Sequence, residues 1–101
     1  MKTHRTPFER QLATAIANLE RGEVVSFGDI AARAGRPKAS RAAGRMLSTV
    51  VDTELPWWRV VYSSGKLPPC NPVLQSARLA DEGVDVENNR VTRAPLGRFE
   101  A

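Results

Sequence analysis

The sequence predicts a mainly α-helical domain with a small β-hairpin, folded as a single unit over residues 1–101. Three observations support this fold class. Four segments begin with a helix-capping residue or a proline and carry apolar side chains at helical spacing. One segment, 57–67, instead has the aromatic and β-branched residues and the central turn that are typical of two short strands. A chain of 101 residues is also the size of one small domain.

Capping boxes predict the first two helices. Thr6 is followed three residues later by Glu9 and then by a periodic apolar stretch, so we expect a helix to begin here. Ser26 and Asp29 repeat the same pattern in front of a second, shorter helix, which Gly35 should end.

The next two segments predict a helix-turn-helix with a wing. A third helix is expected over 37–50, beginning at Pro37. Two short helices joined by a glycine-containing turn, the second of them basic, resemble a helix-turn-helix, although a plain helical hairpin gives the same pattern. Residues 57–67 then predict a strand, a tight turn at 63–65 and a return strand. A hairpin in this place is the wing of a winged helix-turn-helix domain.

The remainder of the chain predicts one more helix and little else. Asn71 should cap a fourth helix that begins at Pro72 and stops at Gly83. Residues 84–91 are expected to add one short strand, and the tail from Thr92 to be loose.

Basic residues are concentrated in the first half of the chain. The net charge is +4; residues 1–50 hold nine Lys or Arg and four Asp or Glu, whereas residues 51–101 hold six against seven. Residues 30–51 contain no acid. The cations of this stretch are Arg33, Arg36, Lys38, Arg41 and Arg45. Such a distribution fits a solvated face and fits equally a surface that binds a polyanion.

The composition excludes several classes of protein. No apolar run approaches the ~20 residues that a membrane-spanning helix needs, and the first ten residues lack the apolar core of an export signal. The single cysteine, Cys70, permits neither an internal disulfide nor a cysteine-based zinc site. We therefore expect a cytoplasmic monomer without a membrane partner, metal or cofactor.

Four stretches in this order resemble the C-terminal DNA-binding domain of the O6-alkylguanine-DNA alkyltransferases. They are the first helix, "GEVVSFGDIAARAGRPKASRAAGRM", "PWWRVVYSSGKL" and "LADEGV". The resemblance runs from about Phe8 to Val86 and is closest to the non-catalytic relatives, the alkyltransferase-like proteins. In this family the third stretch reads Pro-Cys-His-Arg-Val, and its cysteine accepts the alkyl group from the damaged guanine. Here Trp57 stands at the cysteine position and Trp58 at the histidine position.

These two substitutions predict that the family's chemistry is lost. Dealkylation needs a thiolate together with a base or positive field, whereas an indole offers only an N–H donor and an aromatic face. Glu82 corresponds to the glutamate that orients the histidine in this family, and the sole histidine, His4, lies near the start of the chain. We expect a protein that is not an enzyme, with Pro56 and Trp57 at the lesion pocket. Alternation along a strand should send Trp58 to the opposite side, towards the core or a subdomain contact.

Two further residues have roles that the resemblance leaves open. Cys70 lies in the proline-rich loop that borders the alkyl-binding pocket in this family, where it is either inert or a displaced acceptor. Its neighbours in the sequence offer no base. Arg59 belongs to the motif and is interpreted as structural, pairing with an acid to hold the motif in place.

The resemblance assigns DNA binding to the basic helix. Arg41 matches the arginine that fills the gap left by an extruded nucleotide, and Arg45 follows one turn later. Small residues such as Ala42 let the helix approach the minor groove, whose degenerate pattern suits binding with little sequence preference; helix–helix packing is the alternative. Phe27 matches the aromatic residue that helps to rotate the nucleotide, or is a core residue. Candidate phosphate contacts are Ser26, Lys38 and Ser40.

The function implied by the resemblance is that of a DNA damage sensor. Its partners would be double-stranded DNA that contains O6-alkylguanine and proteins of nucleotide excision repair, which the stable complex would recruit. Two other readings remain: a winged-helix DNA-binding or architectural protein that flips no base, and an alkyltransferase that uses Cys70 as its acceptor.

Overall fold

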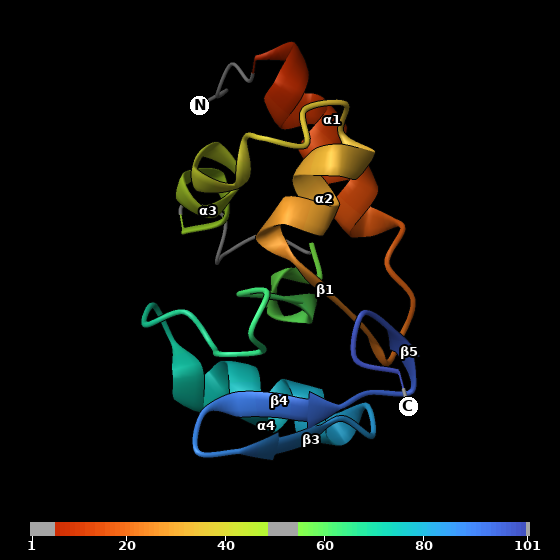
Figure 1. Ribbon diagram of the computed structural model, residues 1–101, viewed down its shortest axis with the longest axis vertical. Helices are drawn as coiled ribbons and strands as arrows, with labels where there is room; N and C mark the ends of the chain where they lie inside the picture. The colour runs from red at the N-terminus through yellow and green to blue at the C-terminus, as the bar shows by residue number, and fades with distance from the viewer. Residues whose placement is uncertain (1–5, 49–54, 101) are drawn as a thin grey trace.

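The computed structural model describes residues 6–48 and 55–100. In chain order the elements are α1 (Pro7–Ala17), β1 (Glu23–Ser26), α2 (Phe27–Arg33), α3 (Ser40–Ser48), the 3-10 helix η1 (Trp57–Arg59), β2 (Val60–Val61), α4 (Pro72–Asp81), β3 (Asp85–Glu87), β4 (Arg90–Arg93) and β5 (Leu96–Gly97). Figure 1 shows α1, α2 and α3 together at one end of the molecule, α4 and the β3–β4 hairpin at the other, and β1 running between them. None of the helices in these residues is long and apolar enough to cross a membrane.

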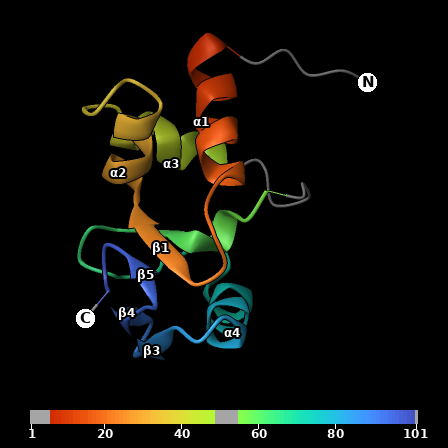
Figure 2. The same cartoon turned by 90° about the vertical axis from the view of Figure 1, so that its right-hand side faces the viewer.

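A small parallel sheet separates two hydrophobic clusters. Its strand order is β2-β1-β5, and both neighbours pair with β1 in parallel. Successive side chains alternate between the faces of a strand, so Val25 and Val60 join the cluster formed with α1, α2 and α3. Val24 and Val61 join the second cluster, formed with α4 and the following strands. Figure 2 shows the same layers from the side, with the three helices above β1 and with α4 and the hairpin below it.

The capping predictions are confirmed. Thr6 and Glu9 form a reciprocal capping box at 3.1 and 2.9 Å, and Ser26 and Asp29 form another with both bonds at 3.0 Å. The Asn71 side chain accepts a bond from the N–H of Leu74 at the start of α4.

The third helix begins three residues later than Pro37, at Ser40. The N–H of Ala39 donates to the carbonyl of Arg36 at 3.0 Å, which closes a four-residue turn around Pro37 and Lys38. Proline is favoured at the second position of such a turn because its φ is already set. The Pro37 signal therefore belonged to the turn between α2 and α3.

The predicted hairpin over 57–67 is wrong. Residues 57–59 form a 3-10 helix, and β2 pairs in parallel with β1 through Val25↔Val60 and Ser26↔Val61. The tight turn is present, with Gly65 at φ 93°, but Lys66 bridges to Arg90 in place of a return strand on β2. Two prolines follow shortly after, at 68 and 69, and proline cannot donate to a ladder.

The chain after Gly83 is more ordered than expected. Residues 85–93 form a hairpin, β3–β4, in place of one strand; its turn has Asn88 and Asn89 at φ 53° and 59°, a conformation that suits a two-residue hairpin loop. The prediction that the tail from Thr92 is loose is also wrong. Ala94 is fully buried, and β5 lies beside β1 as the third strand of the parallel sheet.

Candidate nucleic-acid interface

The exposed face of α3 carries two arginines. Its buried side, made by Ala43, Met46 and Leu47, packs into the helical cluster. Arg41 and Arg45 are exposed on the other side, one turn apart. Within residues 6–48 and 55–100, neither has an ion-pair partner. Their charge is therefore available to a polyanion.

A cleft of about 660 Å³ lies beside this face. Its walls come from the start of α2, from α3, from the segment 57–63, from the proline-rich loop and from α4. The predicted residues that line the cleft are Ser26, Phe27, Ser40, Arg41, Arg45, Trp57 and Cys70. The fold thus gathers residues from positions 26 to 70 around one hollow, and they reach it from segments that are far apart in the sequence.

Three predicted residues lie away from the lining that the described residues form. Lys38 is exposed in the turn between α2 and α3, Ala42 is half-buried against the helical cluster, and Pro56 precedes η1. Ser26 does line the cleft, but it is 3% exposed and its hydroxyl accepts the N–H of Asp29. Because Ala43 is fully buried, helix packing explains that small residue, whereas Gly44 lines the cleft opposite Phe27.

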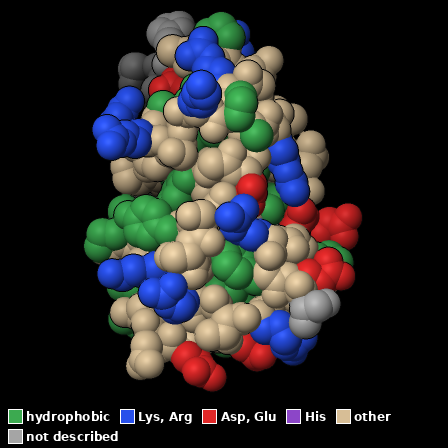
Figure 3. All heavy atoms as spheres, viewed as in Figure 1, with side chains coloured by type: hydrophobic (Ala, Val, Ile, Leu, Met, Phe, Trp, Pro, Cys, Tyr) green, Lys and Arg blue, Asp and Glu red, His purple; other side chains and the backbone are tan. Residues whose placement is uncertain are grey.

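The loop that lines the cleft and the first turn of α4 carry exposed apolar side chains. Val73 is 82% exposed and Leu74 39%, and Pro69 and Cys70 are exposed in the loop before them. Figure 3 shows hydrophobic side chains gathered at one edge of the molecule, at the level of this loop. The acidic side chains of that face gather mainly around the lower half. The lining of the cleft thus includes arginines from α3 and the apolar loop residues Pro68, Pro69 and Cys70.

The two tryptophans diverge from η1 rather than from a strand. Trp57 packs against the helical cluster and Trp58 against the second cluster, with the rings edge to face at 5.9 Å. The two rings pack against different clusters, as expected, but they stay in edge-to-face contact, and the strand alternation that predicted opposite sides is wrong. A 3-10 helix turns by about 120° per residue, which lets the two side chains reach different clusters while their rings remain in contact.

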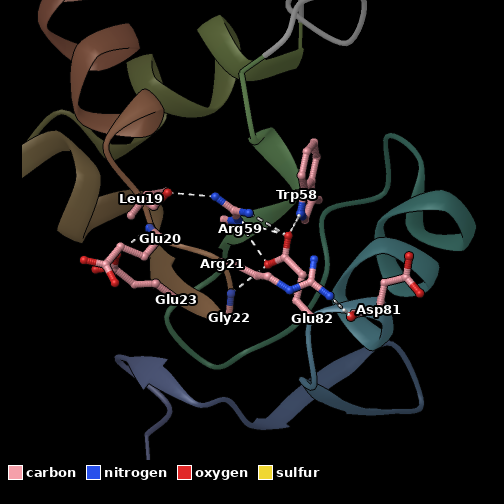
Figure 4. A network of polar contacts seen from close by, with 9 residues as sticks. All are labelled: Leu19, Glu20, Arg21, Gly22, Glu23, Trp58, Arg59, Asp81 and Glu82. Carbon is pink, nitrogen blue, oxygen red and sulfur yellow. Dashed lines mark hydrogen bonds and ion pairs between the residues drawn. The ribbon is translucent and has the colours of Figure 1, made fainter.

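Glu82 holds this segment through a buried polar network (Figure 4). The Nη2 of Arg59 lies 2.7 Å from Glu82 Oε2, and the indole Nε1 of Trp58 donates to the same oxygen at 2.8 Å. The N–H of Gly22 donates to Oε1 at 2.9 Å. Arg59 Nη1 also donates to the carbonyl of Leu19 at 2.7 Å. The network ties η1 to the loop after α1 and to the end of α4, and it confirms the interpretation of Arg59 as structural.

The network also sets the charge of Glu82. Burial alone raises the pKa of this carboxyl group, but the hydrogen bonds from Arg59, Gly22 and Trp58 outweigh it and hold the pKa below its ordinary value. Packing was the whole expected role of Trp58, so its hydrogen bond to Glu82 was missed. The indole N–H is a donor only. It therefore satisfies the carboxylate without adding a base to the cleft.

Sequence reasoning missed two further residues at the cleft. Tyr62 is 43% exposed and its ring lies 5.5 Å from that of Phe27. Gln75 is 2% exposed and donates to the carbonyls of Trp58 and Val60, both at 3.0 Å. An aromatic residue after two buried valines was a usable signal for Tyr62. Gln75 gave none, because a single polar residue on a helix is usually exposed.

A basic helix-turn-helix whose exposed arginines line an aromatic-walled cleft defines a DNA-binding domain of the helix-turn-helix class. Comparison with known families agrees with this class. The chain belongs to the family described as "6-O-methylguanine DNA methyltransferase, DNA binding domain", which matches residues 7–84.

Individual relatives refine this assignment. The DNA base-flipping protein of Escherichia coli (strain K12) is 35% identical over 85 residues, which are 81% of this chain and 66% of that protein. The alkyltransferase-like protein 1 of Schizosaccharomyces pombe is 29% identical over 84 residues, 78% of each chain. The crystal structure of S. pombe Atl1 in complex with damaged DNA containing O6-carboxymethylguanine has a TM-score of 0.76 at 27% identity and covers 84% of this chain and 83% of that one.

Two expectations are confirmed by these comparisons: the resemblance to alkyltransferase-like proteins and the helix-turn-helix fold. The chain spans slightly less than two thirds of the length of the E. coli relative.

Proposed function

We propose that this protein binds duplex DNA that contains O6-alkylguanine, rotates the damaged nucleotide out of the helix and holds it without removing the alkyl group. The observation that carries the proposal is the position of Trp57. It lines the same cleft as Arg41, at the point in the motif where the family has its acceptor cysteine. The cleft also has a volume within the ~300–1,000 Å³ of typical small-molecule sites.

The cleft residues can offset the cost of extruding a base. Flipping costs a few kcal/mol, and less where damage has already weakened the pairing. Arg41, exposed on α3, would enter the stack in place of the nucleotide. Stacking of the extruded base on the rings of Trp57, Phe27 or Tyr62 contributes about 1–3 kcal/mol per contact. Recognition therefore depends on the shape and stacking of the cleft rather than on the sequence of the DNA.

The same residues support a protein that is not an enzyme. Neither indole of the motif can accept an alkyl group as a thiolate does, and Trp58 directs its N–H to Glu82 at 2.8 Å. Without transfer, the complex persists for as long as binding lasts. A long-lived protein–lesion complex would mark the site for nucleotide excision repair, and proteins of that pathway are the partners we propose.

A binding measurement with matched duplexes tests the proposal. Fluorescence anisotropy at one stated salt concentration compares duplexes that differ only in one O6-methylguanine. We expect tighter binding to the lesion, and a loss of about 1–3 kcal/mol in Arg41→Ala. Arg93→Ala is the matched control, because Arg93 pairs with Asp85 on the distant hairpin. Equal affinity of the wild-type protein for both duplexes would refute the proposal that it senses the lesion.

One observation favours a second candidate function. The exposed thiol of Cys70 lines the same cleft, so an alkyltransferase with a displaced acceptor is the alternative. Mass spectrometry after incubation with alkylated DNA decides between them. We expect no added alkyl group; a methyl-sized gain in mass that disappears in Cys70→Ser would establish the enzyme instead.

A further inference from the structure

Residues beyond the family match contact the elements that form the walls of the cleft. The match ends at residue 84, but β5 continues the parallel sheet through Glu23↔Leu96 and Val24↔Gly97. The N–H of Arg98 then donates to the carbonyl of Val24 at 2.9 Å. This backbone pairing brings Arg98 to the end of β1 at which α2 starts.

The side chain of Arg98 joins two walls of the cleft. Its Nη1 lies 3.1 and 3.3 Å from the two carboxylate oxygens of Asp29, and its Nε donates to the carbonyl of Ser63 at 3.2 Å. Asp29 in turn accepts the N–H of Ser26, directly before Phe27. One guanidinium group therefore links the first turn of α2 to the turn that contains Ser63.

This link lies where the parallel ladder ends. The last pair between β1 and β2 is Ser26↔Val61. The residues that follow these two are Phe27 after β1 and Tyr62 after β2. Their rings are 5.5 Å apart at 53°, and both line the cleft. The ladder has no further pair, and Arg98 supplies a polar connection between the start of α2 and the turn after β2.

We infer that Arg98 is a positioning residue for lesion recognition. By fixing the start of α2 against the turn after β2, it keeps Phe27 and Tyr62 packed together as the wall on which an extruded base rests. The identity of the ligand in this inference rests on the proposed function. The geometry that it describes rests only on contacts within this chain.

A second ion pair on the same C-terminal segment provides a matched comparison. Arg93 pairs with Asp85 at 3.1 Å with side chains 53% and 55% exposed, and Arg98 pairs with Asp29 at 3.1 Å with 40% and 33% exposed. The Arg93 pair joins two strands that their own ladder already holds together. Exposed pairs of this kind contribute little, so Arg93→Ala controls for the loss of one exposed arginine.

The experiment compares Arg98→Ala, Arg98→Lys and Arg93→Ala by two readouts. The first is the ratio of affinities for the O6-methylguanine and unmodified duplexes. We expect Arg98→Ala to lower this ratio roughly three- to tenfold through faster dissociation from the lesion, with an unchanged salt slope. Lysine can reach only one of the two partners and should restore the ratio in part. Arg93→Ala should keep it.

The second readout is NMR of the free protein, which needs no DNA. Nuclear Overhauser effects between the rings of Phe27 and Tyr62 are expected to weaken in Arg98→Ala and Arg98→Lys and to persist in Arg93→Ala. Unchanged ring contacts overturn the positioning role even if the protein senses lesions. An equal loss of affinity for both duplexes with a smaller salt slope overturns it too, because Arg98 would then be a phosphate contact. Ring contacts that weaken in a protein without lesion preference support the geometry and refute the proposed function.

Discussion

Replacing Glu82 by glutamine removes a negative charge from the junction of η1, α4 and the loop after α1. The carboxylate accepts hydrogen bonds from Arg59, Trp58 and Gly22 at distances of 2.7 to 3.2 Å. Glutamine has nearly the same shape but keeps only one acceptor oxygen. Its NH₂ group would face donors, and Arg59 would lose its counter-ion.

The expected cost follows from the burial of this pair. The side chains of Arg59 and Glu82 are 13% and 4% exposed, and removing one partner of a buried ion pair costs about 3–5 kcal/mol. Arg59 keeps its bond to the carbonyl of Leu19 and some contact with water. We therefore expect a loss near the lower limit, about 3 kcal/mol of the free energy of unfolding.

Urea unfolding followed by tryptophan fluorescence measures this loss. Glu87→Gln is the control, because Glu87 is exposed on β3 and should change the free energy of unfolding by no more than about 0.5 kcal/mol. Since η1 carries Trp57 into the cleft, Glu82→Gln should also weaken binding to the lesion duplex. A loss below about 1 kcal/mol would refute the reasoning, because the network would then hold the motif only weakly.

Three further predictions concern the stability of the same framework. Trp58→Phe keeps a ring and removes the N–H, so it should lower the free energy of unfolding by about 1.5–3 kcal/mol, the usual range for a hydrogen bond to a charged group; a change within the error of the urea titration would contradict this. Gly97→Ala should destabilise by more than about 1 kcal/mol, because φ is 89° and a Cβ would lie 2.5 Å from the carbonyl of Val24. Gly28→Ala is its control, with a nearest neighbour at 3.7 Å, and an equal fall in melting temperature for both would refute the argument. Hydrogen bonds hold the pKa of Glu82 below its ordinary 4.5, so as the pH falls the unfolded chain takes up this proton first. The contribution of Glu82 to the free energy of unfolding should be fully present above pH 4.5 and should fall below it. In Glu82→Gln the free energy of unfolding should fall less steeply with pH. Parallel pH profiles of the two proteins would exclude this contribution.

Local signals in the sequence predicted the local structure well. The capping boxes at Thr6 and Ser26 and the cap at Asn71 depend on residues within one helical turn, and each begins a helix. The family resemblance likewise indicated Arg41 as a DNA-binding residue and Trp57 as a residue of the lesion pocket, and both line the cleft.

The errors arose where distant partners decide the structure. The aromatic segment was predicted as a strand from its composition, but the side chains of Trp58 and Arg59 in η1 bind Glu82, more than twenty residues away. The sequence around Leu96 contains no pattern that predicts a strand, because its pairing partner Glu23 lies in the first quarter of the chain. A local sequence pattern reflects contacts between residues that are close in the sequence. The pairing of parallel strands depends on residues that are far apart in the sequence, so such a pattern does not predict it.

The strand β5 also bears on where this domain can be cut. It covers one side of β1, and the carbonyl of Val24 and the N–H of Arg98 meet there at 2.9 Å. A fragment trimmed to the shared family region would uncover that side and leave a row of unsatisfied backbone groups, which invites edge-to-edge association between molecules. The family region, residues 7–84, is thus shorter than the stretch that covers both edges of β1 in this chain.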